Sequence, residues 1–501
     1  MKISLRSLIL VFVGVLFINP LQIVLADFQQ DQPMPEQSSS DTAEDTWVYL
    51  PLLNTPGGSS PISDVRRVNA PFVDPTVSDD PLRDSAIFWF GKVTPEENYT
   101  DVRVRYENNR VVFHVEVFDR LLWYDKTTAP NPATFSNWDS VTLLFKLDSS
   151  PSSTPTRNSY RIDAMLNHWE DRQNYQKFYR GNGSTWDAVD LGLTTVSNWR
   201  GDALNNTIED DGWWMRFSLP YSSLGLSGTP PAGTIWQVGL IVYDRDDTLG
   251  SPIAPGRWPE NSQLNDPRTW GELHFGIPKH QPPSLPVTGT IMIRQGIENS
   301  IVPDAAIGGT VDNLCPGDSY FIWNLWGNLN FGDAESLNIQ NQGDVADWPC
   351  FAKYFVTFPL DQIPSGKTIL SASLILHHWG NNGPTELAEY SVVHVFSIDD
   401  EWNESDITWN NAPMAFENLD HIVVPLVDCS NGTNQYLWPC APRTWDVSRA
   451  VDQAYRSQQP ARLALYSSDT AMHSGKLFTT SETGDWNETG RPTLIITYGD
   501  N

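Results

Sequence analysis

The feature that most constrains how this chain can fold is a succession of short apolar segments with the two-residue period of β-strands. Residues 102–106 and 111–118 form one such pair, and the turn residues Glu107-Asn108-Asn109 separate them. The chain has 37 Pro and 33 Gly, which recur with Asn and Asp in the gaps between such segments. Because a strand with one apolar face buries that face by packing sheet against sheet, the pattern predicts an all-β protein of antiparallel sandwiches.

The strand-like segments fall into two groups, which predicts two tandem, jelly-roll-like β-sandwiches. The first group covers residues 61–277 and the second covers residues 289–501. Residues 278–288 between them are rich in Pro and are expected to form a stiff linker. One helix is expected in the second group, because apolar residues recur at helical spacing over 447–455 and Asp446 can cap its start.

The N-terminus has the pattern of a secretory signal peptide over residues 1–26. Lys2 and Arg6 precede an apolar run that is too short to cross a bilayer. Small residues suited to cleavage follow this run. Residues 27–60 are polar and are expected to form a disordered lead-in. The apolar segment 47–53 within it either docks on a later domain or forms a membrane-proximal or partner motif. No later segment is apolar enough to span a membrane, so we expect a secreted, extracellular protein without membrane insertion.

The charge balance narrows the class of partner. The chain has 32 Lys and Arg against 61 Asp and Glu, which gives a net charge of −29 at pH 7. Such a surface repels nucleic acid and anionic membranes, so neither is expected as a partner. The charge also argues against a polyanionic glycan, unless a local basic patch or a bridging cation intervenes.

The four cysteines all lie in the second half of the chain. In an exported protein they are expected to form disulfides, and three pairings are possible. The pairs Cys315–Cys350 and Cys429–Cys440 are favoured, because each closes a local, irregular loop. The alternative of a zinc site lacks histidines at a suitable spacing.

Motifs of catalysis do not support an enzyme. The chain contains neither the His-Glu-x-x-His motif of zinc peptidases nor the Gly-x-Ser-x-Gly elbow of hydrolases. Ser365-Gly366-Lys367-Thr368 lacks the first Gly of a phosphate-binding loop. Glu170 and Asp171 are the carboxylates best placed beside an aromatic residue, but we expect them to form a solvated loop or polar ligand contacts. We therefore predict a non-catalytic protein.

Aromatic residues in polar loops predict a ligand instead. An exposed indole matches the apolar face of a sugar ring, and nearby polar side chains satisfy its hydroxyl groups. The alternative is that each ring caps the core beneath its loop. The candidate sugar-contacting residues are Trp123, Tyr124, Trp169, Trp258 and Arg257.

An acidic cluster predicts a possible cation site. Asp244, Asp246 and Asp247 crowd one strand end, and carboxylate oxygens at short spacing suit Ca²⁺. The alternative is a solvated turn in which Arg245 pairs with these acids.

The first group resembles family 9-type carbohydrate-binding modules. The resemblance rests on Asn98-Tyr99-Thr100-Asp101, Val117-Phe118-Asp119-Arg120, Trp138-Asp139-Ser140-Val141 and Thr269-Trp270-Gly271-Glu272-Leu273-His274-Phe275. It implies an antiparallel β-sandwich that often carries calcium and grips sugar ends between two tryptophans. Trp123 and Trp258 match that pair by loop position.

The second group resembles the DNRLRE-domain family, which overlaps carbohydrate-binding module family 96. The segments that carry this resemblance are residues 354–360, 363–366, 370–374, 402–413, 445–448 and 491–498. It implies a jelly-roll sandwich of a secreted protein, and some such domains bind alginate. The insertion that holds Cys315 and Cys350 departs from the family pattern, and the acidity of the chain argues against alginate itself.

These observations favour a secreted, non-catalytic carbohydrate-binding protein that holds a glycan or polysaccharide by aromatic stacking, with calcium as a structural ion. One alternative is a structural or adhesive protein whose sandwiches bind a protein partner at the cell surface or act as spacers. The other is an enzyme with an unrecognised carboxylate pair, which would require two carboxylates within about 10 Å across a cleft.

Overall fold

The computed structural model describes residues 65–309, 326–341, 351–383, 386–430, 437–471 and 473–500. The predicted signal peptide, the lead-in with its segment 47–53, and the Cys315–Cys350 pair lie outside the described residues. No helix within the described part of the chain is long and apolar enough to cross a membrane. Contacts group Ile62–Asn501 into one compact unit.

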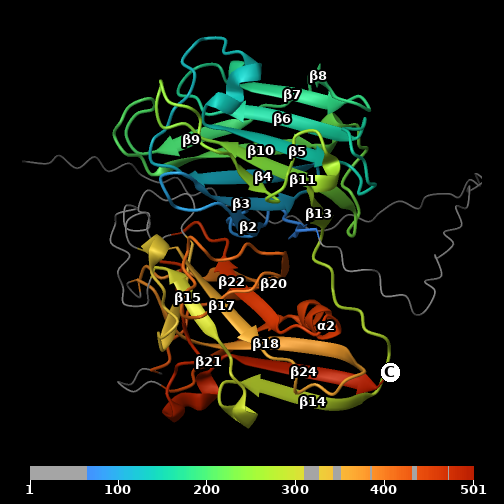
Figure 1. Ribbon diagram of the computed structural model, residues 1–501, viewed down its shortest axis with the longest axis vertical. Helices are drawn as coiled ribbons and strands as arrows, with labels where there is room; N and C mark the ends of the chain where they lie inside the picture. Colours follow the sequence, from blue (N-terminus) through green and yellow to red (C-terminus); the bar gives the residue numbers. More distant parts are fainter. Residues whose placement is uncertain are drawn as a thin grey trace, which may run out of the picture. The chain divides into compact units, whose positions relative to one another are not determined.

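The first sandwich consists of two sheets with the strand orders β1-β13-β11-β5-β6-β7-β8 and β2-β3-β4-β10-β9, and β12 pairs with β11 (Figure 1). Its strands are β1 (Arg67–Ala70), β2 (Ala86–Phe90), β3 (Tyr99–Tyr106), β4 (Arg110–Phe118), β5 (Ser140–Lys146), β6 (Ser159–Met165), β7 (Gln176–Gly181), β8 (Trp186–Val189), β9 (Val196–Arg200), β10 (Gly212–Pro220), β11 (Ile235–Tyr243), β12 (Gly256–Trp258) and β13 (Gly271–Phe275). The predicted strand pair is confirmed as the antiparallel hairpin β3–β4. One pairing departs from the antiparallel expectation, because the edge strand β1 runs parallel to the last strand β13. All the other strands of the sandwich lie between these two in the sequence, so no short turn joins them and forces them to run antiparallel.

The second sandwich consists of two sheets with the strand orders β14-β24-β18-β23-β16 and β15-β17-β22-β19-β20, and β21 pairs with β18. Its strands are β14 (Val287–Arg294), β15 (Asp304–Gly308), β16 (Ser336–Ile339), β17 (Ala352–Phe358), β18 (Lys367–Asn381), β19 (Ser391–Ser397), β20 (Glu417–Val424), β21 (Ala441–Asp446), β22 (Ala461–Ser467), β23 (Lys476–Thr479) and β24 (Thr493–Asp500). Figure 1 shows β14, β24 and β18 side by side. The architecture confirms the predicted all-β fold.

Helical segments are short and lie between the strands. The 3-10 helices are η1 (Pro132–Asn137), η2 (Arg172–Tyr175), η3 (Tyr221–Leu224), η4 (Pro267–Thr269), η5 (Ile297–Asn299), η6 (Trp326–Asn328) and η7 (Asp485–Gly490). The α-helix expected from the apolar spacing is present as α2 (Ser448–Arg456). Asp446 accepts hydrogen bonds from the backbone N–H and the hydroxyl of Ser448, at 2.9 and 2.5 Å, so it satisfies a donor at the start of the helix.

Each sandwich buries a core of its own between its sheets. Trp213 and Trp236 are fully buried in the first core, and Trp445 is fully buried in the second. Large aromatic side chains dominate such cores because each removes roughly 150 to 250 Å² of surface from water. Trp213, Trp236 and Trp445 therefore have no ring face available to a ligand.

A third apolar cluster contains side chains from both sandwiches. Trp89 and Tyr99 come from the first sandwich, and Phe396, Trp409 and Tyr466 come from the second. The ring centroids of Trp89 and Phe396 lie 5.0 Å apart, and those of Tyr99 and Trp409 lie 4.8 Å apart. These edge-to-face and tilted contacts are the geometries that aromatic quadrupoles favour.

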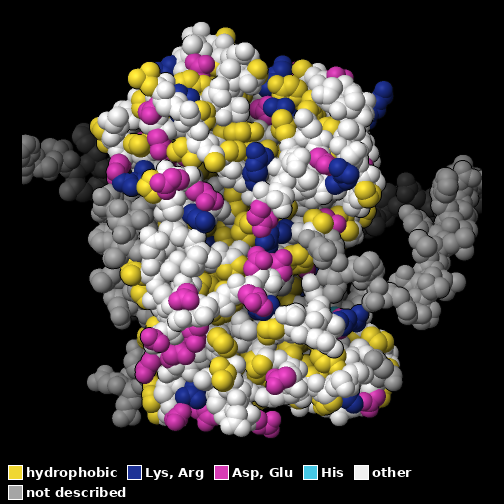
Figure 2. Space-filling model, in the orientation of Figure 1, with side chains coloured by type: hydrophobic (Ala, Val, Ile, Leu, Met, Phe, Trp, Pro, Cys, Tyr) yellow, Lys and Arg dark blue, Asp and Glu magenta, His cyan; other side chains and the backbone are white. Residues whose placement is uncertain are grey.

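Buried polar groups also connect the two sandwiches. Asn69 donates its backbone N–H to Asn418 Oδ1 at 2.7 Å, and Asn418 returns a bond to Asn69 O at 2.9 Å. Arg66 pairs with Glu260 of its own sandwich and, at 3.2 Å each, with Asp399 and Asp400 of the second. Acidic side chains are spread over the visible face in Figure 2, as the net charge of the chain requires.

Candidate functional site

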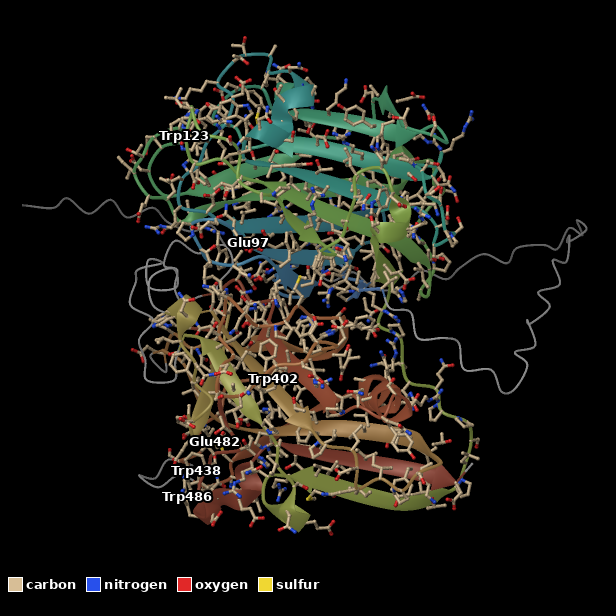
Figure 3. The ribbon with its side chains drawn as sticks, viewed as in Figure 1. Glu97, Trp123, Trp402, Trp438, Glu482 and Trp486 are labelled. Atoms are coloured by element: carbon tan, nitrogen blue, oxygen red, sulfur yellow. A yellow bond between two sulfur atoms is a disulfide. The ribbon has the colours of Figure 1, made fainter. Side chains whose placement is uncertain are left out.

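Three tryptophans meet on the second sandwich. Trp379 lies near the end of β18, Trp438 lies in the loop before β21, and Trp486 lies in η7. The ring centroids of Trp379 and Trp438 are 5.8 Å apart, and those of Trp438 and Trp486 are 5.2 Å apart at an interplanar angle of 85°. Trp438 is 37% exposed and Trp486 is 64% exposed, so this tryptophan cluster presents indole surface to solvent. Figure 3 shows Trp438 and Trp486 at the same end of the sandwich.

Local bonds hold the two exposed tryptophans in place. The predicted disulfide Cys429–Cys440 is present and closes the loop that contains Trp438. Arg491 donates to the backbone O of Thr483 at 2.7 Å and to Asp485 Oδ1 at 2.8 Å, so it binds the residues just before Trp486. Both tryptophans therefore lie in segments that a disulfide or hydrogen bonds hold in place. A side chain that is already held loses less conformational entropy when a ligand stacks on it.

The chemistry around this cluster is mixed. Asp485 and Glu488 flank Trp486 within η7, and the side chain of Asp485 is almost fully exposed. Two indole faces at nearly a right angle form an apolar corner, and the neighbouring carboxylates can accept hydrogen bonds from hydroxyl groups. A sugar ring has both features that such a corner recognises.

A buried histidine adjoins the first of the three tryptophans. His378 Nε2 lies 2.8 Å from Gly380 O, and Nδ1 lies 3.4 Å from an Nη of Arg443. An N–H at Nε2 that donates to the carbonyl leaves Nδ1 free to accept from Arg443, which is the arrangement of neutral imidazole. Burial, together with the charges of Arg443 and Lys476, lowers the pKa of His378 to about 3.

This lowered pKa predicts an acid-sensitive contribution to stability. In the unfolded chain His378 takes up a proton near pH 6.5, whereas in the folded chain it does so only near pH 3. The stability that the neutral folded-state histidine contributes is therefore fully present above about pH 6.5 and is lost as the pH falls toward about 3. Between pH 7 and pH 5 we expect wild type to lose about 2 kcal/mol more free energy of unfolding than the His378→Gln variant. Denaturant titration of both proteins at the two pH values measures the difference, and equal losses in both would contradict the prediction.

A second exposed aromatic group lies on the first sandwich. Trp169 is 81% exposed, and its ring centroid lies 5.7 Å from that of Trp199 and 4.5 Å from that of His168. Tyr124 donates its hydroxyl to Glu170 Oε1 at 2.7 Å, which connects the loop after β4 to the loop after β6. The structure therefore brings Tyr124 and Trp169 into adjoining loops, as a shared site would require.

Glu170 and Asp171 have structural partners in this loop. Glu170 accepts the Tyr124 hydroxyl and the backbone N–H of His168, and Asp171 caps η2 by accepting the N–H of Gln173. These bonds agree with the expectation of polar loop contacts.

The structure corrects the expected pairing of Trp123 with Trp258. Trp258 is 1% exposed and packs against Phe88 with ring centroids 4.3 Å apart, so its faces are covered by the core. Trp123 is 7% exposed and Tyr124 is 5% exposed, which leaves little of either ring for a ligand. Alternation along β12 turns Trp258 inward, and loop position alone did not reveal this. Of the predicted stacking rings, Trp169 is the one with an open face.

Arg257 lies apart from these rings. Its Nη1 donates to Ser262 O at 2.7 Å, and its side chain lines an open hollow of about 410 Å³ with Tyr243 and Asn261. The predicted set therefore does not form one site: Arg257 and Trp258 belong to β12, and Tyr124 and Trp169 belong to the loops after β4 and β6.

The predicted acidic cluster has a different membership in the structure. Carboxylate oxygens of Asp119, Asp244 and Asp246 lie within 4.8 Å of one another. Asp247 instead accepts the backbone N–H groups of Leu249 and Gly250 in an exposed turn, so it is corrected to a turn residue. Asp119 follows β4, and the sequence offered no sign that this strand end would meet the end of β11.

The acidic cluster is electrostatically costly without a counter-charge. Burial and the charge of Asp246 raise the pKa of Asp244 to about 7, and burial and the charge of Asp247 raise that of Asp246 to about 6. One oxygen of Asp244, Oδ1, is buried and accepts no hydrogen bond within the described residues. Three converging carboxylates with an unsatisfied buried oxygen fit the all-oxygen donor set of Ca²⁺.

Comparison with known protein families bears on the second sandwich. Residues 317–498 match the family model of carbohydrate-binding module family 96, which confirms the resemblance of the second sandwich. The matched region contains Trp379, Trp438 and Trp486. No curated protein matches the chain.

Solved structures similar to the chain include two family 9 carbohydrate-binding modules from Caldicellulosiruptor kristjanssonii. The module in complex with cellotriose is 14% identical, with a TM-score of 0.30, and the match covers 45% of this chain and 100% of that chain. The module in complex with glucose is 16% identical, with a TM-score of 0.30, and the match covers 44% of this chain and 100% of that chain.

Proposed function

We propose that this protein is a secreted, non-catalytic carbohydrate-binding protein that holds an extracellular glycan on the tryptophan cluster of its second sandwich. The observation that carries the proposal is the exposed corner formed by Trp438 and Trp486, which lies inside the region that matches carbohydrate-binding module family 96. Export is supported by the signal-peptide pattern of residues 1–26.

Stacking explains how the corner would hold a sugar. Each indole face removes the apolar C–H face of a pyranose from water, and the right angle between the rings lets one face support the sugar while the other closes one side. Asp485 and Glu488 would accept hydrogen bonds from ring hydroxyls. Their negative charges disfavour uronic acids, so the site suits a neutral glycan.

A structural Ca²⁺ ion forms part of the proposal for the first sandwich. Asp119, Asp244 and Asp246 would hold it, and the bound ion would neutralise their repulsion and connect the loop after β4 to the end of β11. Trp169, which is exposed on the same sandwich, would then offer a second and weaker contact to an extended polysaccharide.

Substitution of the exposed tryptophans tests the proposal. We expect Trp486→Ala and Trp438→Ala each to weaken glycan binding about tenfold, because each removes a stacking face worth about 1 to 1.5 kcal/mol. A glycan array on the full chain identifies the ligand, and calorimetry with that ligand gives the dissociation constants. Trp169→Ala removes the exposed indole of the other sandwich and should weaken binding less than either variant, because its proposed contact is the weaker one.

The array also defines the outcomes that would refute this function. A folded wild-type protein that binds no glycan across a broad array would favour the structural or adhesive alternative. Binding that survives loss of both Trp438 and Trp486 but disappears in Trp169→Ala would move the site to the first sandwich.

A further inference from the structure

A second carboxylate cluster lies in the other sandwich, where no sequence pattern indicated a cation site. Carboxylate oxygens of Asp304, Glu404 and Glu482 lie within 4.8 Å of one another. Asp304 opens β15 and Glu404 lies between β19 and β20. Glu482, which is labelled in Figure 3, follows β23. Three segments that are distant in the sequence therefore each place one acid at the same point.

One oxygen in this cluster is buried and lacks a donor. Asp304 is 0% exposed, and its Oδ2 accepts the hydroxyl of Tyr354 at 2.5 Å and the backbone N–H of Ser481 at 2.8 Å. Its Oδ1 is buried and has no hydrogen-bond partner within the described residues. A buried carboxylate oxygen without a hydrogen-bond donor costs free energy. Such an atom in a folded protein therefore indicates a bound partner, such as an ion.

The surrounding bonds hold the other two acids in place. The backbone N–H of Asp304 donates to Glu404 Oε1 at 2.7 Å, and the hydroxyl of Ser481 donates to Glu482 at 3.0 Å. The structure shows no ion pair between these three acids and a Lys or Arg of the described ranges. Arg462 pairs instead with Glu401, and Arg491 pairs with Asp485.

We infer that Asp304, Glu404 and Glu482 form a binding site for a hard divalent cation of the Ca²⁺ type. Three carboxylates without a nitrogen or sulfur ligand select hard cations over zinc and copper. Ca²⁺ accepts irregular coordination by carboxylates and water at 2.3 to 2.6 Å, whereas Mg²⁺ requires a nearly regular octahedron. Because the ligands come from loops and a strand end, the irregular arrangement suits Ca²⁺.

The ion would connect the corner that contains Trp402 and Trp409 to the loop that leads into η7. Thr480 and Thr483 already fix this loop by donating their hydroxyls to the backbone O atoms of Ala334 and Glu335, at 2.6 and 2.9 Å. None of its ligands belongs to the tryptophan cluster, so ion binding can be measured without a glycan.

Counting bound ions tests the site. The full chain is stripped with EGTA and passed through chelating resin, and Ca²⁺ is then added while calorimetry measures the number and affinity of the sites. We expect Glu482→Gln and Glu404→Gln each to bind one Ca²⁺ ion fewer than wild type, or to bind it at least about tenfold more weakly. Both glutamines keep an oxygen that can accept the existing hydrogen bonds, so each variant removes charge with little change of shape.

Two further variants separate this site from other effects. Glu401→Gln removes the same charge from an exposed position three residues from Glu404, and it should bind as many ions as wild type. Asp246→Asn should lose a different ion, so that Glu482→Gln combined with Asp246→Asn loses two. A wild-type chain that binds no Ca²⁺, or glutamine variants that bind as many ions as tightly as wild type, would overturn the inference. Neither readout requires a glycan, so the result is distinguishable from failure of the proposed carbohydrate binding.

Discussion

Replacing Lys353 by methionine is expected to lower the free energy of unfolding by about 3 to 5 kcal/mol. Lys353 is 1% exposed, and its Nζ lies 3.8 Å from the ring centroid of Trp409 and 4.2 Å from that of Trp89. It also donates to the hydroxyl of Tyr99 at 2.6 Å. The ammonium is thus desolvated, and cation–π contacts in such a site are worth about 2 kcal/mol or more.

The expected loss is large because a negative charge would stay behind. Asp101 is fully buried and accepts hydrogen bonds from Tyr99, Tyr466 and Asn341. Burial lowers the pKa of Lys353, and the charge of Asp101 opposes that decrease, so the two charges stabilise each other. Methionine keeps the length of the side chain and removes the charge, which isolates the electrostatic part.

Denaturant titration followed by tryptophan fluorescence measures the effect of this change. Lys92→Met is the control, because Lys92 is half exposed and its pair with Glu97 spans 3.8 Å, so we expect a change within about 0.5 kcal/mol. Asp101→Asn in combination with Lys353→Met should recover part of the loss, since it removes the uncompensated charge. A loss below about 1 kcal/mol in Lys353→Met would show that the aromatic cage tolerates a neutral side chain.

The second large effect is expected at Glu116. Its side chain is fully buried, and it pairs with Arg103 at 2.8 Å through Oε2 and with Arg200 through Oε1. Glu116→Gln leaves two guanidinium groups without their carboxylate, which should cost about 3 to 5 kcal/mol of unfolding free energy. Glutamine has nearly the same volume, so a cavity does not contribute to the loss.

This substitution should also weaken the connection between the sandwiches. Arg103 donates through Nε to Ser468 O at 3.0 Å and through Nη2 to Asp469 O at 2.8 Å, and both acceptors belong to the second sandwich. Limited proteolysis of the two sandwiches should therefore be faster in Glu116→Gln than in wild type. Glu97→Gln serves as the control, because Glu97 is only partly buried and its pair with Lys92 spans 3.8 Å (Figure 3). Equal stability of Glu116→Gln and Glu97→Gln would contradict the argument.

Several elements followed directly from local sequence patterns. The hairpin β3–β4 was predictable because side chains alternate between faces with period two, and the helix α2 was predictable from the spacing of its apolar residues. The Cys429–Cys440 disulfide was predictable because its loop is short. The order of landmarks in the second sandwich was enough for the family resemblance that the match over residues 317–498 confirms.

The candidate sites depended on contacts that local patterns do not encode. Trp379, Trp438 and Trp486 come from three separate segments, and no local pattern marks them as neighbours. Trp258 had an equally polar context in the sequence, yet it is buried against Phe88. Whether a loop indole turns toward solvent depends on which strand lies beneath it, and a single segment cannot show this.

By itself, the sequence determined the all-β class, the two sandwiches and the strongly acidic surface of this protein. These properties arise from composition and from the period of apolar residues, which act within a few positions along the chain. The tertiary structure alone decided that Asp119 joins Asp244, that Asp304 meets Glu482, and that an exposed tryptophan corner forms at one end of the second sandwich. The physical reason is that the order of strands in a sheet brings segments that are distant in the sequence together. That order alone sets which carboxylates lie next to one another.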